Sequence, residues 1–287
     1  MNAFASFRAL GTEETLQLGL VGAGIAASRT PAMQEREGAA HGLRTVYRLF
    51  DTPLATPDDL GALVRAMELC GYAGFNVTYP FKIAILDHLH ELDESARIVG
   101  AVNTVVLRDG RRIGFNTDLG GFTDAFAETM TGAARRRVLQ IGAGGAGLAV
   151  AGGLLDCGVE ELFVHDLDHE RARLLVQRLE EQGRGRVRAV SSVEGAYDGI
   201  VNATPIGTDK RPGLPYPIER LGPETFVVDV NYFPLESQLI REAKARGCRT
   251  MGGAGMAVGQ AVRAFSCFTG LRADRERMMA AFLALGA

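Results

Sequence analysis

The segment Gly142-Ala143-Gly144-Gly145-Ala146-Gly147 constrains the fold more than any other part of this sequence. It follows the apolar run Val138–Ile141, which is typical of a buried strand, and it precedes Leu148–Leu155, which is typical of an apolar helix. A strand, a G-x-G-x-x-G turn and a helix in this order present backbone N–H groups and the positive end of a helix dipole to a pyrophosphate. The segment therefore predicts a dinucleotide site whose phosphate loop contains Gly142, Gly144, Gly145, Ala146 and Gly147.

An acidic residue stands where such a site needs one. Asp166 closes the next predicted strand, 19 residues after Gly147, and its carboxylate can accept hydrogen bonds from ribose hydroxyls. The following turn adds Asp168, with Arg171 as its obvious cation. Two carboxylates would repel a 2′-phosphate, so NAD is favoured and NADP is disfavoured. The alternative, a solvated turn in which Asp166 caps a helix, is disfavoured by the complete order of strand, loop, helix, strand and acid.

Short apolar runs alternate with helical patterns along the whole chain, which indicates an α/β protein. In the first part the Asp109-Gly110 dipeptide predicts a hairpin, so that sheet is expected to be mixed. In the second part the pattern is typical of a doubly wound parallel sheet of the Rossmann type. The predicted strands are Leu16–Val21, Thr45–Phe50, Gly74–Thr78, Ala101–Leu107, Arg112–Phe115, Val138–Ile141, Leu162–His165, Val187–Val190, Ile200–Ala203 and Phe226–Val230.

The composition is that of a folded protein of about two domains. Of its 287 residues 47% are hydrophobic and 23% are charged, which argues against disorder. A net charge of −3 gives no electrostatic footprint for nucleic acid or an anionic membrane, so a small-molecule partner is expected. The cysteines form no C-x-x-C pair, which favours buried, reduced thiols.

The sequence shows no pattern typical of a signal peptide, a membrane span or a metal site. The segment Met1–Arg8 does not have the pattern of a signal peptide, and no apolar run reaches the ~18 residues of a membrane span, so a cytoplasmic protein is expected. His88 and His90 are two positions apart in a predicted helix, Phe81–Leu89, and would point in different directions. We therefore expect no metal site.

Lysine is scarce in this chain: only Lys82, Lys210 and Lys244 occur among 31 basic residues. A retained lysine can serve as an amine where arginine cannot, because arginine does not give up its proton. Lys82 directly follows a predicted strand, and Asn103 and Asn116–Asp118 also stand at predicted strand ends. Ligands of α/β proteins bind at such positions, although a solvated surface lysine is the more ordinary interpretation of any single one.

Several further motifs accompany the nucleotide loop along the chain. In order they are Ser28–Met33, Asn76–Lys82, Gly100–Thr104, Asn116–Asp118 with Gly120–Phe122, Gly142–Gly147, Asn202–Gly207, Asp229–Pro234, and Gly255–Met256 with Gln260. In these motifs and their order the chain resembles the shikimate/quinate dehydrogenase family over essentially its whole length.

This resemblance implies a domain plan and a reaction. Residues 1–117 with 254–287 would form a substrate-binding catalytic domain, and residues 118–253 a dinucleotide-binding domain. The family oxidises a hydroxyl of shikimate or quinate to a ketone with a nicotinamide cofactor, and Lys82 with Asp118 would be the catalytic pair. Which of the two is the base stays open. The other residues carried over are Ser28, Thr30, Thr78, Asn103, Tyr232 and Gln260 for the substrate, and Thr204, Val230 and Gly253 near the nicotinamide.

Two departures from the commonest family pattern, Thr30 and the Asp166–Asp168 loop, resemble the branch that uses NAD and accepts quinate as well as shikimate. They favour a catabolic or dual-substrate role over dedicated NADP-dependent biosynthesis of aromatic amino acids. Two alternatives stay open: a catalytically silent protein that senses NAD or a metabolite, and a dehydrogenase of a related cyclic substrate such as aminoquinate. The preferred substrate and the oligomeric state, including a homodimer, also stay open.

Overall fold

The computed structural model describes residues 15–52 and 57–284. The segment Met1–Arg8, interpreted above as lacking a targeting signal, lies outside the described residues. The chain forms two compact units. The first runs through Thr117 and resumes at Gln260, and the second is Asp118–Gly259.

The first unit is built on a mixed sheet, as predicted. In the order β2-β1-β3-β5-β6-β4, β1 is parallel to β2 and to β3, whereas β5 is antiparallel to both of its neighbours. The carboxyl ends of β1, β3 and β6 and the amino end of β5 therefore lie along one edge of the sheet. The strands are β1 (Thr15–Gly22), β2 (Arg44–Asp51), β3 (Gly74–Val77), β4 (Glu91–Leu92), β5 (Thr104–Arg108) and β6 (Arg111–Phe115).

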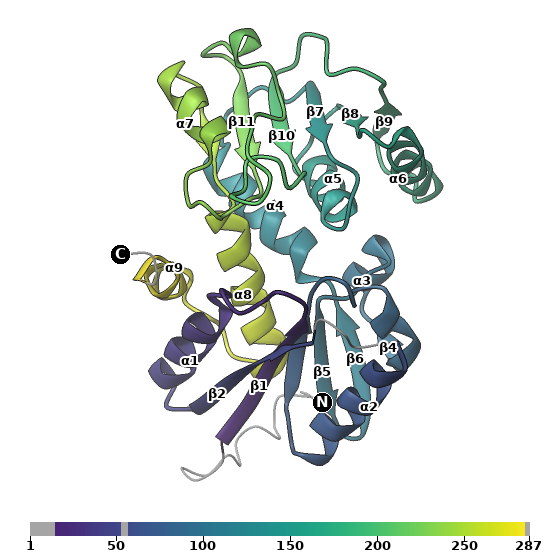
Figure 1. Ribbon diagram of the computed structural model, residues 1–287, viewed down its shortest axis with the longest axis vertical. Coiled ribbons are helices and arrows are strands. Elements are labelled where there is room, and N and C mark those ends of the chain that lie inside the picture. The colour runs from purple at the N-terminus through teal and green to yellow at the C-terminus, as the bar shows by residue number, and fades with distance from the viewer. Residues whose placement is uncertain (1–14, 53–56, 285–287) are drawn as a thin grey trace. The chain divides into compact units, whose positions relative to one another are not determined.

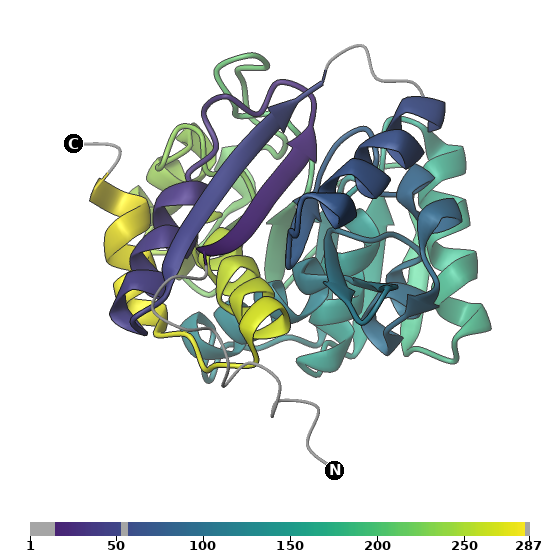
Figure 2. The same ribbon diagram turned by 90° about the horizontal axis from the view of Figure 1, so that it is seen from below.

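Both faces of this sheet are covered by apolar side chains. Leu60 and Val64 of α2 (Pro57–Leu69) pack on one face, and Phe268 of α8 (Ala254–Thr269) packs on the other. Figure 2 shows α1 (Thr30–Ala40) and α9 (Arg275–Ala284) side by side.

A buried carboxylate joins α1 and α9. Glu37 of α1 is fully buried and accepts two 2.9 Å hydrogen bonds from Arg277 Nη1. It also accepts the backbone N–H of Asp274. A buried charge needs partners of this kind, because desolvation without them is costly.

The helix predicted over Phe81–Leu89 is wrong in type and extent. The structure has turns at 81–83 and then a 3₁₀ helix, η2 (Ala84–His88). The carbonyl of Lys82 accepts a 2.8 Å hydrogen bond from the N–H of Val102, which lies just before β5. This carbonyl is therefore not available for the hydrogen bonds of an α-helix. The remaining helix of this unit is α3 (Glu94–Val99), capped by the Asp93 side chain.

The second unit contains a parallel sheet in the order β12-β11-β10-β7-β8-β9. Figure 1 labels the strands from β11 to β9 in this order. The strand order reverses between β7 and β10, at the switch point where dinucleotides bind in doubly wound folds. The predicted Rossmann-type sheet is confirmed. The strands are β7 (Arg137–Ile141), β8 (Glu161–His165), β9 (Arg186–Ala189), β10 (Gly199–Asn202), β11 (Phe226–Asp229) and β12 (Thr250–Met251).

Helices cover both faces of this sheet. One face packs against α4 (Thr117–Thr129), α5 (Gly147–Asp156) and α6 (His169–Glu181). The other packs against α7 (Gln238–Ala245) and the short η3 (Ile218–Arg220). Among the described residues no helix has the length and hydropathy needed to cross a membrane.

The four cysteines are all free, but one expectation about them is wrong. Only Cys248 is buried, whereas Cys157 and Cys267 are partly exposed and Cys70, which follows the last residue of α2 at the surface, is exposed. Burial raises the pKa of the Cys267 thiol to about 11, so this group is protonated at neutral pH.

Candidate functional site

The glycine loop lies at the switch point, between β7 and α5. Gly142 has a φ of +106°, and a Cβ placed on it would lie 2.7 Å from the carbonyl oxygen of Ala203. Its N–H donates to the carbonyl of His165, the last residue of β8 (2.7 Å). Only glycine suits this position, because the conformation is left-handed and a neighbouring backbone is in contact.

The middle of the loop has a different character. A Cβ on Gly144 or Gly145 would meet no atom within 4 Å, and neither residue has a positive φ. Packing and backbone strain therefore do not require glycine there. Glycine at these two positions leaves the backbone open to close approach by a ligand, and the loop ends at the amino end of α5, where N–H groups and the helix dipole favour a phosphate. These residues fit a dinucleotide pyrophosphate.

Asp166 lies beside this loop and is tied to it. Its Oδ2 accepts the N–H of Ala143 at 2.7 Å and its Oδ1 accepts the N–H of Asp168 at 2.9 Å. A carboxylate can accept about four hydrogen bonds, so both oxygens can take more donors. Asp168 caps α6, and its side chain pairs with Arg171 at 3.3 Å. Both side chains of that ion pair are more than half exposed.

Three predicted cofactor positions come together at the ends of β10 and β11. The carbonyl of Thr204 accepts Asn231 Nδ2 (2.9 Å), and a Cβ on Gly253 would meet the carbonyl oxygens of Val230 and Asn231. The Tyr232 ring packs against Phe233 at 4.8 Å.

A buried polar network that sequence reasoning did not identify holds these two loops. The Asp229 carboxylate accepts Ser237 Oγ (2.6 Å), Asn202 Nδ2 (3.0 Å) and the N–H of Asn231 (3.0 Å). Asn202 Oδ1 in turn accepts the N–H and the hydroxyl of Thr204. The motifs around Asn202 and Asp229 were visible in the sequence, but local spacing does not show that their side chains meet.

Burial raises the pKa of the Asp229 carboxyl above its ordinary value, while the hydrogen bonds from Ser237, Asn231 and Asn202 lower it. Desolvation is the larger effect, because the carboxyl is fully buried.

In the first unit the sheet edge brings polar side chains together around Asn103. Asn103 is 5% exposed; its Nδ2 donates to Thr117 Oγ1 (3.0 Å) and its Oδ1 accepts the N–H of Thr117 (2.8 Å). Lys82 is half-buried, and its carbonyl accepts a hydrogen bond from the N–H of Val102, the residue that directly precedes Asn103. Asp118, which is 2% exposed, directly follows Thr117. Both proposed catalytic residues are thus anchored within one residue of the Asn103 cluster.

Ser28 and Thr78 lie on loops at this same edge, and Thr30 is the first residue of α1. Ser28 Oγ donates to Thr30 Oγ1 (3.1 Å) and accepts the N–H of Thr30 (3.3 Å), at the start of α1. The N–H of Ala23 donates to the carbonyl of Tyr79 (2.9 Å), which joins the loop after β1 to the loop of Thr78.

Gln260 is half-buried on α8. The carbonyl of the next residue, Ala261, accepts Gln34 Nε2 of α1 (2.9 Å). The helix that carries Thr30 is therefore bonded to the helix that carries Gln260.

His88 and His90 take part in packing. His90 Nδ1 accepts the N–H of Arg112 (3.0 Å), and the His88 ring lies against Gly61. Within residues 15–52 and 57–284 no cluster of three metal-ligating side chains occurs.

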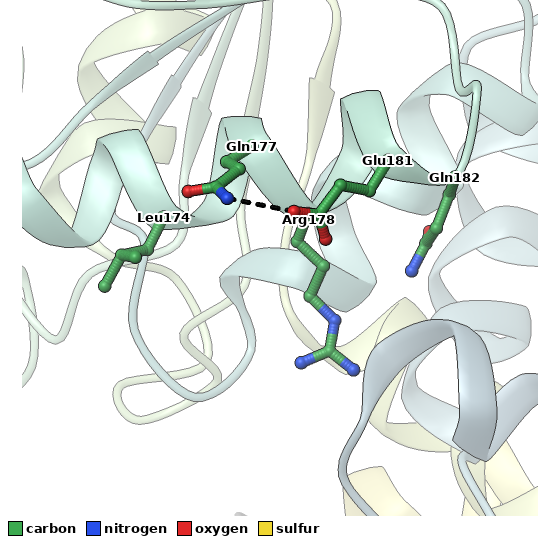
Figure 3. Close-up of a pocket in the computed structure, with 5 residues that line it drawn as sticks. All are labelled: Leu174, Gln177, Arg178, Glu181 and Gln182. Carbon is green, nitrogen blue, oxygen red and sulfur yellow. Dashed lines mark hydrogen bonds between the residues drawn. The ribbon is translucent and has the colours of Figure 1, made fainter.

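Two surface hollows lie apart from most of these residues. One of about 530 Å³ is lined by Leu174, Gln177, Arg178, Glu181 and Gln182 (Figure 3). It lies on the last turns of α6 and just beyond, and α6 runs away from the carboxyl edge that carries the glycine loop. The other, of about 460 Å³, includes His165, Tyr216 and Glu219; His165 directly precedes Asp166.

Comparison with known proteins gives two family matches. Residues 20–105 match the family model described as the shikimate dehydrogenase substrate binding domain. Residues 253–281 match the shikimate 5′-dehydrogenase C-terminal domain.

Similar proteins cover nearly the whole chain. The quinate/shikimate dehydrogenase (NAD(+)) of Corynebacterium efficiens is 46% identical over 281 residues, which cover 95% of this chain and 99% of that protein. The shikimate dehydrogenase (NADP(+)) of Streptomyces avermitilis is 46% identical over 277 residues, which cover 94% and 95%. The solved quinate dehydrogenase from Corynebacterium glutamicum in complex with NAD superposes with a TM-score of 0.90 at 43% identity, covering 94% of this chain and 99% of that one.

Proposed function

The chain belongs to the shikimate dehydrogenase family, and on this basis we propose its function. It is an NAD-dependent oxidoreductase of a CH–OH group that interconverts shikimate with 3-dehydroshikimate, quinate with 3-dehydroquinate, or both. The observation that carries this proposal is the open glycine loop at the switch point, bonded through Ala143 to the Asp166 carboxylate. The names of the relatives support the two substrates.

The choice of NAD over NADP rests on charge. Relatives of equal identity are named for either cofactor, so overall similarity does not decide between them. The turn after β8 places Asp166 and Asp168 together, and Arg171 is paired with Asp168. A 2′-phosphate on the adenosine ribose would meet carboxylates there, whereas the free ribose hydroxyls of NAD can donate to Asp166.

The two units take different roles in this proposal. The unit containing residues 118–253 binds the dinucleotide: Gly142, Gly144, Gly145, Ala146 and Gly147 hold the pyrophosphate. Asp166 and Arg171 lie at the adenosine end, and Thr204, Val230 and Gly253 lie beside the nicotinamide. The unit containing residues 1–117 and the final helices binds the hydroxy acid. A cytoplasmic location is part of the proposal, supported by four free cysteines.

Lys82 and Asp118 carry the proton chemistry. Bound NAD supplies the acceptor for the hydride that leaves the carbinol carbon. The hydroxyl proton must depart as the ketone forms, which requires a base within ~3 Å of that oxygen. The pair provides an amine and a carboxylate for this task, with one member accepting the proton and the other orienting its partner.

The substrate is held by short neutral groups around one anion. Ser28 and Thr30, which already share a hydrogen bond, face the carboxylate, with Tyr232 at the same end. Thr78, Asn103 and Gln260 bind the ring hydroxyls. A polyhydroxylated acid requires such a set of adaptable donors and acceptors.

The test is a steady-state assay of nicotinamide reduction that crosses quinate and shikimate with NAD and NADP. We expect turnover with NAD on at least one acid and a markedly lower kcat/KM with NADP. Protein that binds NAD but turns over neither acid would contradict the proposal and would favour a sensor or a related cyclic substrate. Comparable kcat/KM values for both cofactors would overturn the cofactor assignment alone.

Replacing Asp166 with alanine is expected to raise the KM for NAD about tenfold, which corresponds to ~1.4 kcal/mol of lost binding. The change removes an acceptor for the ribose hydroxyls and a negative charge that repels a 2′-phosphate. The ratio of kcat/KM for NAD to that for NADP should therefore fall, which kinetics with each cofactor in turn would measure.

Glu224→Ala is the matched control, because Glu224 is exposed and precedes β11 at the opposite, amino edge of the same sheet. It removes the same charge without touching the loop. If Asp166→Ala and Glu224→Ala give the same cofactor ratio, the ribose contact is wrong.

A further inference from the structure

Gln140 is a polar residue in the middle of the buried strand β7, between Leu139 and Ile141. It is fully buried. Its side-chain nitrogen donates two hydrogen bonds of 2.9 Å, one to the carbonyl of Gly142 and one to the carbonyl of Gly147. These are the first and last glycines of the loop. One amide therefore bridges the two ends of the whole hexapeptide.

The orientation of this amide follows from its partners. Two carbonyl oxygens require a donor, so the Nε2 atom must face them and the Oε1 atom must face away. Within the described residues Oε1 is buried and has no hydrogen-bond partner. An apolar side chain at position 140 would avoid this desolvated oxygen. The core alone therefore gives no reason for glutamine here.

The bond to Gly142 sets the direction of one peptide plane. In a trans peptide the C=O and the following N–H point in opposite directions. Gln140 holds the carbonyl of Gly142 from the inner side, and Asp166 Oδ2 holds the N–H of Ala143 from the other side at 2.7 Å. The peptide group between Gly142 and Ala143 is thereby hydrogen-bonded at both its C=O and its N–H.

The bond to Gly147 fixes the other end of the loop. Gly147 begins α5, and a Cβ on it would lie 3.0 Å from the carbonyl oxygen of Gly142. The two loop ends are thus in close approach, with the Gln140 amide bonded to both. Gly144 and Gly145, the open positions, lie between these fixed points.

From this geometry we infer that Gln140 is a positioning residue for the cofactor, which holds the glycine loop and Asp166 in the arrangement that receives the pyrophosphate and the adenosine ribose. The inference rests on the proposed dinucleotide site and adds a residue that does not touch the ligand. Its contribution is preorganisation: a loop already held in the bound shape loses less freedom on binding.

The test replaces Gln140 with methionine, which has a similar shape and no donor. The dissociation constants of NADH and of ADP-ribose, measured by calorimetry, are expected to rise about tenfold, the effect of losing a net hydrogen bond or two. ADP-ribose lacks the nicotinamide, so an equal loss for both ligands locates the effect at the loop. At saturating NAD, kcat and the KM for the hydroxy acid are expected to stay unchanged.

Leu139→Met is the control, because it places the same side chain on the same strand but in the core of the opposite face. Melting temperatures of both variants separate packing from positioning. Unchanged dissociation constants in Gln140→Met would overturn the inference. The inference would also be overturned if Leu139→Met raised the two dissociation constants as much as Gln140→Met does. A rise in the dissociation constants accompanied by a fall in both kcat and the melting temperature would overturn it as well.

A failure of the proposed function can be told apart from a failure of the inference about Gln140, because the first is measured by turnover and the second by ligand binding. Wild-type protein that binds NADH and ADP-ribose but oxidises neither quinate nor shikimate would contradict the proposed reaction, while the comparison of Gln140→Met with Leu139→Met would still decide the role of Gln140.

Discussion

Replacing Lys82 with methionine is expected to lower kcat by about 10²–10⁴-fold, the range typical of a lost general acid or base. The KM values for NAD and for the hydroxy acid should change little. Methionine keeps the length and apolar stem of lysine, and the backbone hydrogen bond between Lys82 and Val102 does not depend on the side chain. Steady-state kinetics with the better of the two acids measures the effect.

Lys210→Met is the matched control for this prediction. Lys210 is exposed and lies in the loop after β10, and its replacement removes the same charge from a chain with few lysines. A kcat of Lys82→Met within about threefold of wild type would show that Lys82 does not move the proton, since general acid–base catalysis contributes at least ~10²-fold. The proton would then have to be assigned to another group.

The same substitution in two glycines of one loop is expected to have opposite consequences. Gly142→Ala should lower the free energy of unfolding by roughly 2–4 kcal/mol, because it combines a left-handed backbone with overpacking against Ala203. Gly144→Ala should leave that free energy within about 0.5 kcal/mol of wild type, as for a surface change. Yet Gly144→Ala should raise the dissociation constant of NADH about tenfold or more, because its methyl group enters the space where we propose that the pyrophosphate binds.

Chemical denaturation and NADH titration of both variants test this contrast. If Gly144→Ala binds NADH as wild type does, the open space beside Gly144 does not receive the cofactor. If Gly142→Ala is as stable as wild type, the close approach to Ala203 does not constrain the loop.

The fold was largely predictable because its signals are local. Strands such as Val138–Ile141 are short apolar runs, and the glycine loop with Asp166 marks one of the units as a Rossmann-type sheet. Strands β4 and β12 were missed, since each has two residues and shows no period. The strand predicted from Ala101 begins at Thr104, because the carbonyl of Ala101 accepts the Asn116 side chain and the N–H of Val102 donates to the carbonyl of Lys82.

The candidate site was predictable only where a motif carries it. The glycine-loop pattern identified Asp166 as a candidate, and strand-end positions with the family resemblance identified Lys82 and Asn103, but neither showed what holds these residues. The contacts of Gln140 with the loop ends and of Asp229 with Asn202 depend on which face of a strand a side chain occupies and on residues far away in the chain. Polar residues inside apolar strands were the available signal, and their partners were not visible from spacing.

The division of the chain has a consequence for biosynthesis. The unit that comes first in the sequence lacks part of its core until the end of translation, because Phe268 of α8 packs on its sheet. Its buried Glu37 also lacks its ion-pair partner until Arg277 has been synthesised. The inserted unit, Asp118–Gly259, is continuous and has all of its strands earlier. Since domains fold as units while the ribosome proceeds, the unit proposed to bind the cofactor is expected to reach its native state before the unit proposed to bind the substrate, although translation of the latter begins first.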